Sequence, residues 1–431
     1  MADNEGEDRD GGLRSTLGEM FVNQAWRVLS ALLAGLSFGW ACQAFELNLT
    51  ASLEAAARLV GGLWLDALKM TILPLVGSLL IVGICETAEH SRSSRLGARI
   101  LVLIGGLLCL ATALAAVVST ALLSLWPSPV AGHLVTGTLT MATAPDLSAF
   151  ARGILPQNVF QAATEGSVLS IVVFCILFAI GLTRVEAPIR KVGLDFFRAC
   201  SGALLQVVGG VLWLAPLGVL ALAFNLGVTT GGTALGGLAH YVLIVSLVGV
   251  CAWLLAYPVA IGLGGLKLRA FSRAVLPAQA VALSTQSSIA ALPSMLAAAK
   301  SLGVQEETAG FSLPIAVALF RITGPAMNLA VAIYTAHVLG LTLAPHTVAA
   351  GAAIAVLTTV GSVGLPGQTS FLTSITPIAA VMGVPVEPLV IFLAIEMAPD
   401  LIRTVGNVTA DVALAAAVDR DAVPTTEETP C

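Results

Sequence analysis

The sequence predicts an all-α polytopic membrane protein, and the prediction depends on its composition, its long apolar stretches and the placement of its basic residues. Of the 431 residues, 57% are hydrophobic and only 10% are charged, whereas a soluble domain usually carries about 25% charged residues. A soluble core of this length cannot hide so much apolar surface. Lipid is therefore the natural solvent for most of the chain.

Several apolar stretches reach the roughly 20 residues that a helix needs to cross a membrane. Because lipid offers no partners to backbone polar groups, such stretches are expected to be helical. About eight spans are expected, with further apolar pieces that are too interrupted to cross alone. The clearest stretches are 28–46, 63–85, 100–126, 169–182, 241–263 and 389–417.

The basic residues lie in alternate loops. The intervening loops, at 47–50, 127–156 and 227–240, contain a single Lys or Arg residue, Arg152. Because Lys and Arg favour the cytoplasmic side, we expect a multi-pass protein of the plasma membrane (the inner membrane, if the cell is bacterial) with both termini cytoplasmic. The basic loops contain Arg92, Arg95 and Arg99, then Arg184, Arg190, Lys191 and Arg198, then Lys267, Arg269 and Arg273.

The two ends of the chain are expected to lie outside the membrane. Residues 1–27 are acidic and mixed, and they lack the basic-then-apolar pattern of a cleaved signal peptide. Residues 418–431 are polar and predict a cytoplasmic tail. The membrane part is thus expected within 28–417.

Two breaks interrupt the apolar signal between residues 276 and 417. Small, hydroxyl and turn-forming residues fill 282–295 ("ALSTQSSIAALPSM") and 358–374 ("TTVGSVGLPGQTSFLTS"). Each break has short apolar arms and is followed by a longer helix, which predicts two re-entrant hairpins in an inverted repeat, entering the membrane from opposite sides. Such paired interruptions indicate a transporter's binding site. The alternative is two ordinary loops between weak helices.

The last apolar stretch carries a polar stripe. At 100° per residue its six polar side chains fall within an arc of roughly 100° on one helix face. A charge at the bilayer centre costs at least ~2.5–3.5 kcal/mol, so the stripe must face protein, water or a ligand. Its members are Glu396, Asp400, Arg403, Thr404, Asn407 and Asp411.

The charges of this stripe indicate the ligand. Asp400 and Arg403 are three residues apart and can pair with each other in a structural role, but that pair leaves Glu396 and Asp411 unexplained. An excess of carboxylates suits an ammonium group, Na⁺ or H⁺, whereas the guanidinium suits a carboxylate. The stripe therefore predicts a zwitterionic or acidic small molecule carried with a cation.

Several motifs resemble the dicarboxylate/amino acid:cation symporters, the glutamate transporter family. "PDLIRTVGNVTAD" (399–411) is similar to their last helix, and "STQSSIAALP" (284–293) and "VGLPGQTS" (363–370) are similar to their two hairpin tips. "GGLWLDALKMTILPLV" (61–76) and "APLGVLALA" (215–223) resemble their second and fifth helices. The resemblance covers nearly the whole chain, with the motifs in the right order.

The resemblance implies a homotrimer in lipid, with eight transmembrane helices and two hairpins in each protomer and an elevator motion. Helices one, two, four and five of 28–275 would form the scaffold, while helices three and six would move with the transport core at 276–417. Asp400 would bind a substrate ammonium group and Arg403 a carboxylate. The other implied contacts are Thr404 and Asn407 beside the substrate, Asn407 and Asp411 at a sodium site, and Ser287, Ser288, Gly364, Pro366 and Gly367 at the closing tips.

The seventh helix departs from the family. Relatives carry Asn-Met-Asp-Gly-Thr there, whereas this chain has "LFRITGPAMN" (319–328). If the motif is aligned on its glycine, Arg321 stands where relatives have the Asn and Thr323 where they have the Asp. In an alignment without a gap, Phe320 and Ile322 stand at those two positions. We hypothesise that Arg321 replaces a bound Na⁺ as a tethered cation; alternatively, it reaches the interface from a helix end. Gly324-Pro325 is expected to break the helix.

These observations predict a transporter for aspartate, glutamate or a related dicarboxylate, not an enzyme. No cofactor and no nucleic-acid partner are expected, and Na⁺ or H⁺ is the candidate coupling ion, with Arg321 and Glu396 as further candidate coupling residues. One alternative is a C4-dicarboxylate symporter or exchanger, which applies if Arg321 pairs with Asp400 and so keeps it from the substrate. Another alternative is an anion channel. An intramembrane hydrolase is disfavoured because nucleophilic catalysis needs a base, and every His lies near a loop or a helix end.

Overall fold

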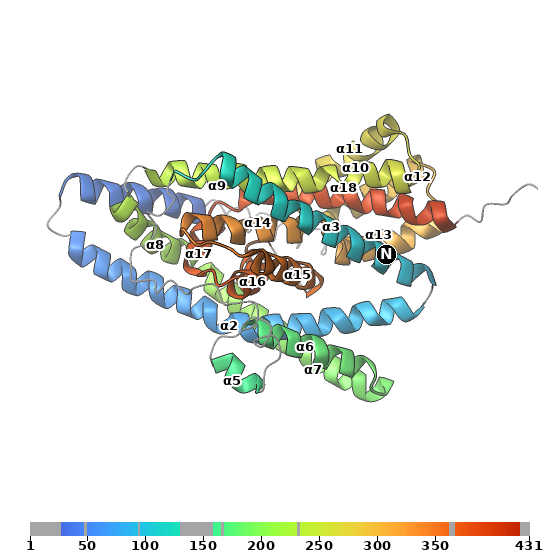
Figure 1. The fold of residues 1–431 in the computed structure, drawn as a ribbon, viewed down its shortest axis with the longest axis horizontal. Helices are drawn as coiled ribbons and strands as arrows, with labels where there is room; N and C mark the ends of the chain where they lie inside the picture. The colour runs from blue at the N-terminus through green and yellow to red at the C-terminus, as the bar shows by residue number, and fades with distance from the viewer. Residues whose placement is uncertain are drawn as a thin grey trace, which may run out of the picture.

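The computed structural model describes residues 27–46, 50–93, 95–129, 158–164, 168–230, 233–361 and 367–422. Within these ranges the chain is helical and contains no strand (Figure 1), which confirms the all-α prediction. Among the described residues, five helical segments are long and apolar enough to cross a membrane: Arg99–Leu125, Ala187–Trp213, Leu235–Leu263, Glu306–Val338 (which includes the non-helical residues 320–322) and Met397–Arg420. Shorter apolar helices are Leu73–Glu86, Ser170–Thr183, Ala215–Thr229, Pro345–Thr359 and Phe371–Val381. The expected total of eight spans stays a prediction.

Most helices of the first half of the chain pack against one another. Glycines let the helix over residues 27–44 approach α8 closely, since a Cβ at Gly39 would lie 2.2 Å from the Phe224 carbonyl oxygen. Trp64 Nε1 donates a hydrogen bond to the Val211 carbonyl oxygen at 2.8 Å, which links α2 to α7. The elements are α2 (Thr50–Ser93), α3 (Arg95–Leu125), α5 (Val159–Thr164), α6 (Val168–Thr183), α7 (Ala187–Trp213) and α8 (Ala215–Thr230).

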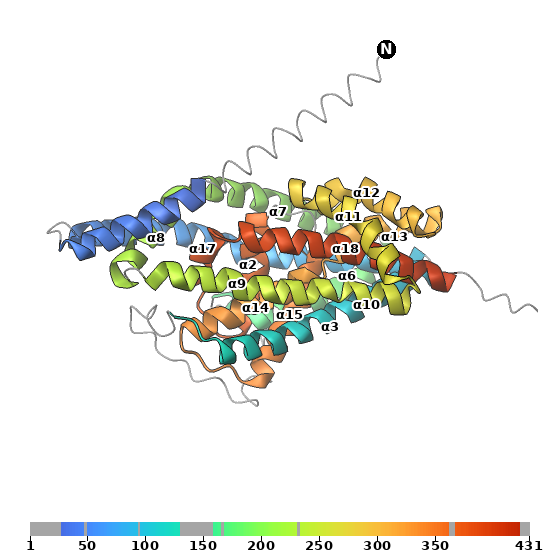
Figure 2. The same ribbon diagram turned by 90° about the horizontal axis from the view of Figure 1, so that it is seen from above.

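The second half surrounds α18. Figures 1 and 2 show α18 running alongside α9, and it also packs against α11, α12, α13 and α14. Thr409 fixes two of these contacts, because its Oγ1 accepts hydrogen bonds from Trp253 Nε1 at 3.0 Å and Gln279 Nε2 at 2.9 Å. The elements are α9 (Thr233–Leu254), α10 (Ala256–Pro258), the π-helix η1 (Val259–Leu263), α11 (Leu268–Thr285), α12 (Ser288–Ser301), α13 (Glu306–Leu319), α14 (Thr323–Val338), α15 (Pro345–Gly361), α16 (Gly367–Val381), α17 (Glu387–Leu393) and α18 (Met397–Ala422).

Both predicted breaks coincide with the meeting point of two packed helices. Only Gln286 and Ser287 separate α11 from α12, and Gln286 adopts a left-handed conformation with φ 52°. Ser287 then caps α12, since its Oγ accepts a hydrogen bond from Ala290 N at 3.3 Å. Helices α15 and α16 also pack together, and their connection at 362–366 lies outside the described residues. The re-entry of these pairs into a membrane stays a prediction.

The packing separates the described helices into two groups. Helices α6, α7 and α8 pack against α2, whereas α9 and α11 to α14 pack against α18 or one another. Contacts of α3, α15 and α16 with α2 join the groups. The long helix α2, which contains Pro74 and bends in Figure 1, therefore contacts α6, α7 and α8 as well as α3, α15 and α16.

Candidate functional site

A proline determines where α18 begins. Pro399 lies in the first turn, where the backbone N–H groups have no partner within the helix and a missing N–H is tolerated. Since α17 ends at Leu393 and α18 starts at Met397, the expectation of one continuous span over 389–417 was wrong. Glu396 lies in the turn before α18 rather than on its face. Its carbonyl oxygen accepts a hydrogen bond from Asp400 N at 2.9 Å, so the turn leads directly into the helix.

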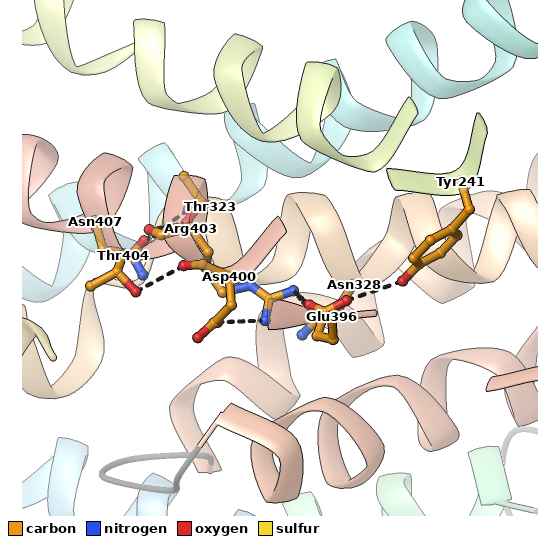
Figure 3. A network of polar contacts seen from close by, with 8 residues as sticks. All are labelled: Tyr241, Thr323, Asn328, Glu396, Asp400, Arg403, Thr404 and Asn407. Carbon is orange, nitrogen blue, oxygen red and sulfur yellow. Dashed lines mark hydrogen bonds and ion pairs between the residues drawn. The ribbon is translucent and has the colours of Figure 1, made fainter. Parts of the chain in front are cut away.

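Arg403 is at the centre of an ion-pair cluster (Figure 3). Its Nη2 lies 2.6 Å from Glu396 Oε1 and its Nη1 lies 3.1 Å from Asp400 Oδ1. Asn328 of α14 adds a longer contact, with Oδ1 3.5 Å from Nη2. Arg403 and Glu396 are each 3% exposed. Arg403 Nε has no hydrogen-bond partner among the described residues, so the guanidinium retains an unused donor.

Tyr241 holds Glu396 from the other side. Its hydroxyl donates a hydrogen bond to Glu396 Oε2 at 3.1 Å. The Tyr241 ring stacks on Phe392 with ring centroids 4.1 Å apart and meets Tyr334 edge-on. Since Tyr241 is fully buried, this hydroxyl is fixed in place. The Glu396 carboxylate is therefore held between a cation and a hydroxyl group.

Asn407 connects α18 to the start of α14. Its Oδ1 accepts hydrogen bonds from the Thr323 hydroxyl at 2.7 Å and from Thr323 N at 3.1 Å. The first N–H groups of a helix lack partners within it, so Asn407 caps α14 from a neighbouring helix. Residues 320–322 are not helical, and Pro325 lies in the first turn of α14. The expected helix break therefore exists and precedes Gly324-Pro325.

Asp411 is a buried carboxylate that lacks hydrogen bonds. It is 0% exposed, and neither of its carboxylate oxygens has a hydrogen-bond partner among the described residues. The charge of Arg321, at the break between α13 and α14, acts on it. Arg321 is partly buried and within electrostatic range of Asp400 and Arg403 as well. The charge of Arg321 thus acts on residues of α18.

The remaining predicted residues lie on or near these elements. Thr404 is buried, and its hydroxyl donates a hydrogen bond to the Asp400 carbonyl oxygen at 2.9 Å. Ser287 and Ser288 are partly buried at the start of α12, which packs against α18. Gly367 is the first residue of α16, whereas Gly364 and Pro366 lie outside the described residues.

The cluster carries more negative than positive charge. Three carboxylates (Glu396, Asp400 and Asp411) face two guanidiniums (Arg321 and Arg403), which gives a net charge of −1 when all are ionised. Arg403 Nε is a donor without a partner among the described residues, and the Asp400 side chain is 15% exposed. Within the described ranges, no group of three or more His, Cys, Asp or Glu side chains is placed to hold a metal ion.

Tyr241 and Asn328 belong to the cluster and were not predicted. Both come from helices far from α18 in sequence, and helical periodicity says nothing about such pairings. The available signal was weak: a Tyr hydroxyl that is buried in an apolar span needs a hydrogen-bond partner. That requirement indicates a polar contact for Tyr241 without identifying Glu396.

Gly406 permits the close packing behind the cluster. A Cβ at this position would lie 2.5 Å from Thr323 Cγ2 and 2.9 Å from Trp253 Cβ. We expect Gly406→Ala to push α18 away from α14 and to destabilise the protein by about 1–3 kcal/mol, as overpacking does. Thermal unfolding in detergent measures the effect. Gly310→Ala is the matched control, since a Cβ there meets no atom within 4 Å; an equal loss of stability in both variants would contradict the packing argument.

Comparison with known proteins places the chain among membrane carriers. The profile of the sodium:dicarboxylate symporter family matches residues 25–421. The proton/sodium-glutamate symport protein of Bacillus subtilis is 28% identical over 379 residues, covering 83% of this chain and 84% of that protein. The proton/glutamate-aspartate symporter of Escherichia coli is 25% identical over 89% of both chains. C4-dicarboxylate transport protein 3 of Ralstonia nicotianae is 28% identical, covering 97% of this chain and 95% of that protein.

Proposed function

Since the chain belongs to the sodium:dicarboxylate symporter family, we propose that it moves an acidic amino acid (aspartate or glutamate) or a related dicarboxylate across the membrane, with a reduced or altered dependence on sodium. It is a multi-pass membrane transporter and not an enzyme. One observation carries the choice of substrate: Arg403 is 3% exposed and has one donor without a partner. A buried guanidinium with a free donor suits a carboxylate.

An uptake screen tests this function. Purified protein in liposomes is offered radiolabelled aspartate, glutamate, succinate, serine and alanine, each with Na⁺ and with choline in its place. We expect uptake of at least one of the three acids and little uptake of serine or alanine. A preference for the neutral amino acids would contradict an acidic substrate.

A variant at Asp400 tests whether the substrate is an amino acid or a dicarboxylate without an ammonium group. Its side chain is 15% exposed and pairs with Arg403, whereas Arg403 itself is 4% exposed, so Asp400 is the more accessible partner. If the substrate has an ammonium group, Asp400→Ser is expected to lower aspartate uptake by roughly 10-fold to 100-fold, because hydrogen bonds to charged groups contribute about 1.5–3 kcal/mol. Succinate uptake should be unchanged.

The control for that variant is Asp195→Ser. Asp195 is another carboxylate three residues from its arginine partner, with its Oδ1 3.2 Å from Arg198 Nη1, but it is exposed on α7. It should transport as the wild type does. Equal losses of aspartate and succinate uptake in Asp400→Ser would contradict a role in binding the ammonium group.

The proposed change in sodium dependence is argued from Arg321. A Na⁺ ion needs several oxygen ligands, and Asp411 supplies two unpartnered oxygens, which fits a cation. The Asn407 oxygen, however, already accepts two hydrogen bonds from Thr323, and Thr323 is no carboxylate. The Arg321 charge acts on Asp411. This electrostatic effect supports a tethered cation over an Arg321 that extends to the membrane interface.

The elevator and the trimer are part of the same proposal. The group around α2 would be the trimerising scaffold, and the group around α18 would carry the substrate. The tip residues Ser287 and Ser288, together with 364–367, would close over the substrate with backbone groups. Cross-links between α2 and α15, which pack together, would be expected to trap the protein and stop uptake.

Two other functions remain as alternatives. A C4-dicarboxylate symporter or exchanger is favoured by the Ralstonia relative and would apply if Arg321 neutralises Asp400, since both lie in electrostatic range. An anion channel would give currents without accumulation of a labelled acid. The uptake screen separates these outcomes.

A further inference from the structure

A patch of unpaired positive charge lies where η1 leads into α11. Each of its three cations is exposed, and none forms an ion pair with a carboxylate among the described residues. The neighbouring sequence offers no such partner, because no Asp or Glu occurs between Asp195 and Glu306. The members of this basic patch are Lys267, Arg269 and Arg273.

The basic patch continues into an apolar stripe on the outer face of α11. At 100° per residue, the five members of this face fall within an arc of about 80°, and all are exposed, Leu276 by 58% and Leu283 by 51%. The opposite face is buried, with Phe271 and Val275 each 0% exposed, and α11 packs against α12 and α18. The outer face of α11 is therefore charged in its first turns and apolar after them. Its members are Arg269, Arg273, Leu276, Ala280 and Leu283.

The basic patch lies at the end of an apolar span. The span Leu235–Leu263 is followed at once by the turn 264–266, in which Leu266 N donates a hydrogen bond to the Ala260 carbonyl oxygen at 3.1 Å. Because the turn is this short, Lys267 follows directly after the last residues of the span. Lipid headgroups lie at the ends of membrane spans, and Lys and Arg are favoured there on the cytoplasmic side. The basic patch is therefore expected at the level of the headgroups.

We propose that the basic patch binds the phosphate of an anionic phospholipid, whose acyl chains lie along the apolar stripe of α11. Arg269 and Arg273 are one turn apart on the same face, so both guanidiniums can reach one headgroup. A guanidinium binds phosphate oxygens through paired hydrogen bonds, and anionic lipids attract basic residues beside a span. The binding uses no residue of the Arg403 cluster, so the inference does not depend on the proposed substrate.

The apolar stripe is the reason to choose a lipid over other anions. A free phosphate would neutralise the cations and leave Leu276 and Leu283 in water, whereas a lipid provides partners for both. The chain's own residues 423–431 ("VPTTEETPC") contain two Glu, but Val423 is the only Leu, Ile, Val, Met or Phe among them. That segment would neutralise charge without covering the stripe.

Lipid selectivity in detergent tests the proposal. Purified full-length protein receives phosphatidylglycerol or phosphatidylcholine with the same acyl chains, and the rise in Tm with lipid concentration gives the apparent Kd of each lipid. Because each Lys or Arg near an anionic lipid surface contributes about fivefold in affinity, we expect a preference for phosphatidylglycerol of roughly 10-fold to 100-fold. The preference should shrink as NaCl is raised, since salt screens exposed charges.

Three variants connect the preference to the basic patch. The double variant Arg269→Gln, Arg273→Gln should lose at least about tenfold of the preference, whereas Arg269→Lys, Arg273→Lys keeps the charges and should retain most of it. Lys300→Gln is the matched control, because Lys300 is also an exposed cation but has Glu306 Oε2 3.9 Å from its Nζ. It should bind both lipids as the wild type does. The Tm of each variant without added lipid shows that it is folded.

The contrary outcomes are distinct. Equal affinity of the wild type for the two lipids, or an unchanged preference in the double Gln variant, would overturn the inference. Equal stabilisation by glycerol 3-phosphate would overturn it in favour of a site for free phosphate. A preference that emerges only after residues 423–431 are removed would overturn it in favour of the chain's own acidic end. Uptake of aspartate, glutamate or succinate tests the proposed function separately from all of these.

Discussion

Replacing Arg403 with alanine is expected to reduce transport severely, with a loss of at least about 30-fold in kcat/KM. The variant loses the group that would bind the substrate carboxylate, and truncating one partner of a buried charged pair costs about 2–5 kcal/mol. It also leaves Glu396, which is 3% exposed, without its cation. Initial rates of uptake into proteoliposomes, at several substrate concentrations, measure the effect.

Two further variants separate binding from folding in this experiment. Arg403→Lys keeps the charge but lacks the planar fork of donors, so it should recover only part of the activity. Arg198→Ala removes an arginine that is 46% exposed and also pairs with two carboxylates. Exposed pairs contribute less than about 1 kcal/mol, so this control should retain transport. Wild-type kinetics in a folded Arg403→Ala variant would contradict the assigned role.

The second large effect is expected at Arg321. If its guanidinium replaces a bound cation, wild-type uptake should change by less than about twofold when choline replaces Na⁺. Arg321→Ala removes the charge that acts on the fully buried Asp411, and an uncompensated buried charge costs about 3–5 kcal/mol. The variant should therefore lose more than about tenfold of its uptake in choline and recover part of it in Na⁺.

Thermal unfolding gives an independent reading of the same variant. A ligand that binds the folded state alone stabilises it by an amount that grows with the logarithm of the ligand concentration, so Na⁺ should raise the Tm of Arg321→Ala and leave that of the wild type unchanged. Arg420→Ala is the control, since Arg420 is exposed in the last turn of α18 and donates a hydrogen bond to the Gly262 carbonyl oxygen. A steep, multi-ion sodium requirement in the wild type would contradict the tethered cation.

Periodicity and composition were sufficient for part of the site. The 3.6-residue repeat correctly put Asp400, Arg403 and Asn407 together, because all lie on one helix, α18. The first break, rich in small and hydroxyl residues, correctly located the junction of α11 with α12, whereas the connection of α15 to α16 lies outside the described residues. Both inferences concern local sequence, where backbone preferences determine the structure.

The remaining features depend on contacts between distant segments. Glu396 was placed on the helix face, but Pro399 sets the start of α18 after it. Tyr241 is 155 positions from Glu396 and Thr323 is 84 from Asn407, and no pattern within either helix specifies its partner. Arg321 allowed two interpretations in sequence, because a charge near a helix break can turn inward or toward the interface. Whether the Arg321 charge acts on Asp411 depends on how α13, α14 and α18 pack together.

The most direct measurement of the central claim is accumulation of a labelled acid by this protein in liposomes. Vesicles loaded with unlabelled aspartate, glutamate or succinate are diluted into the same labelled acid, under imposed proton and sodium gradients in turn. We expect the wild type to concentrate at least one of the acids inside, and Arg403→Ala to concentrate none. Absence of accumulation of all three acids under every gradient, by protein shown to be folded, would contradict a small anion docking at Arg403.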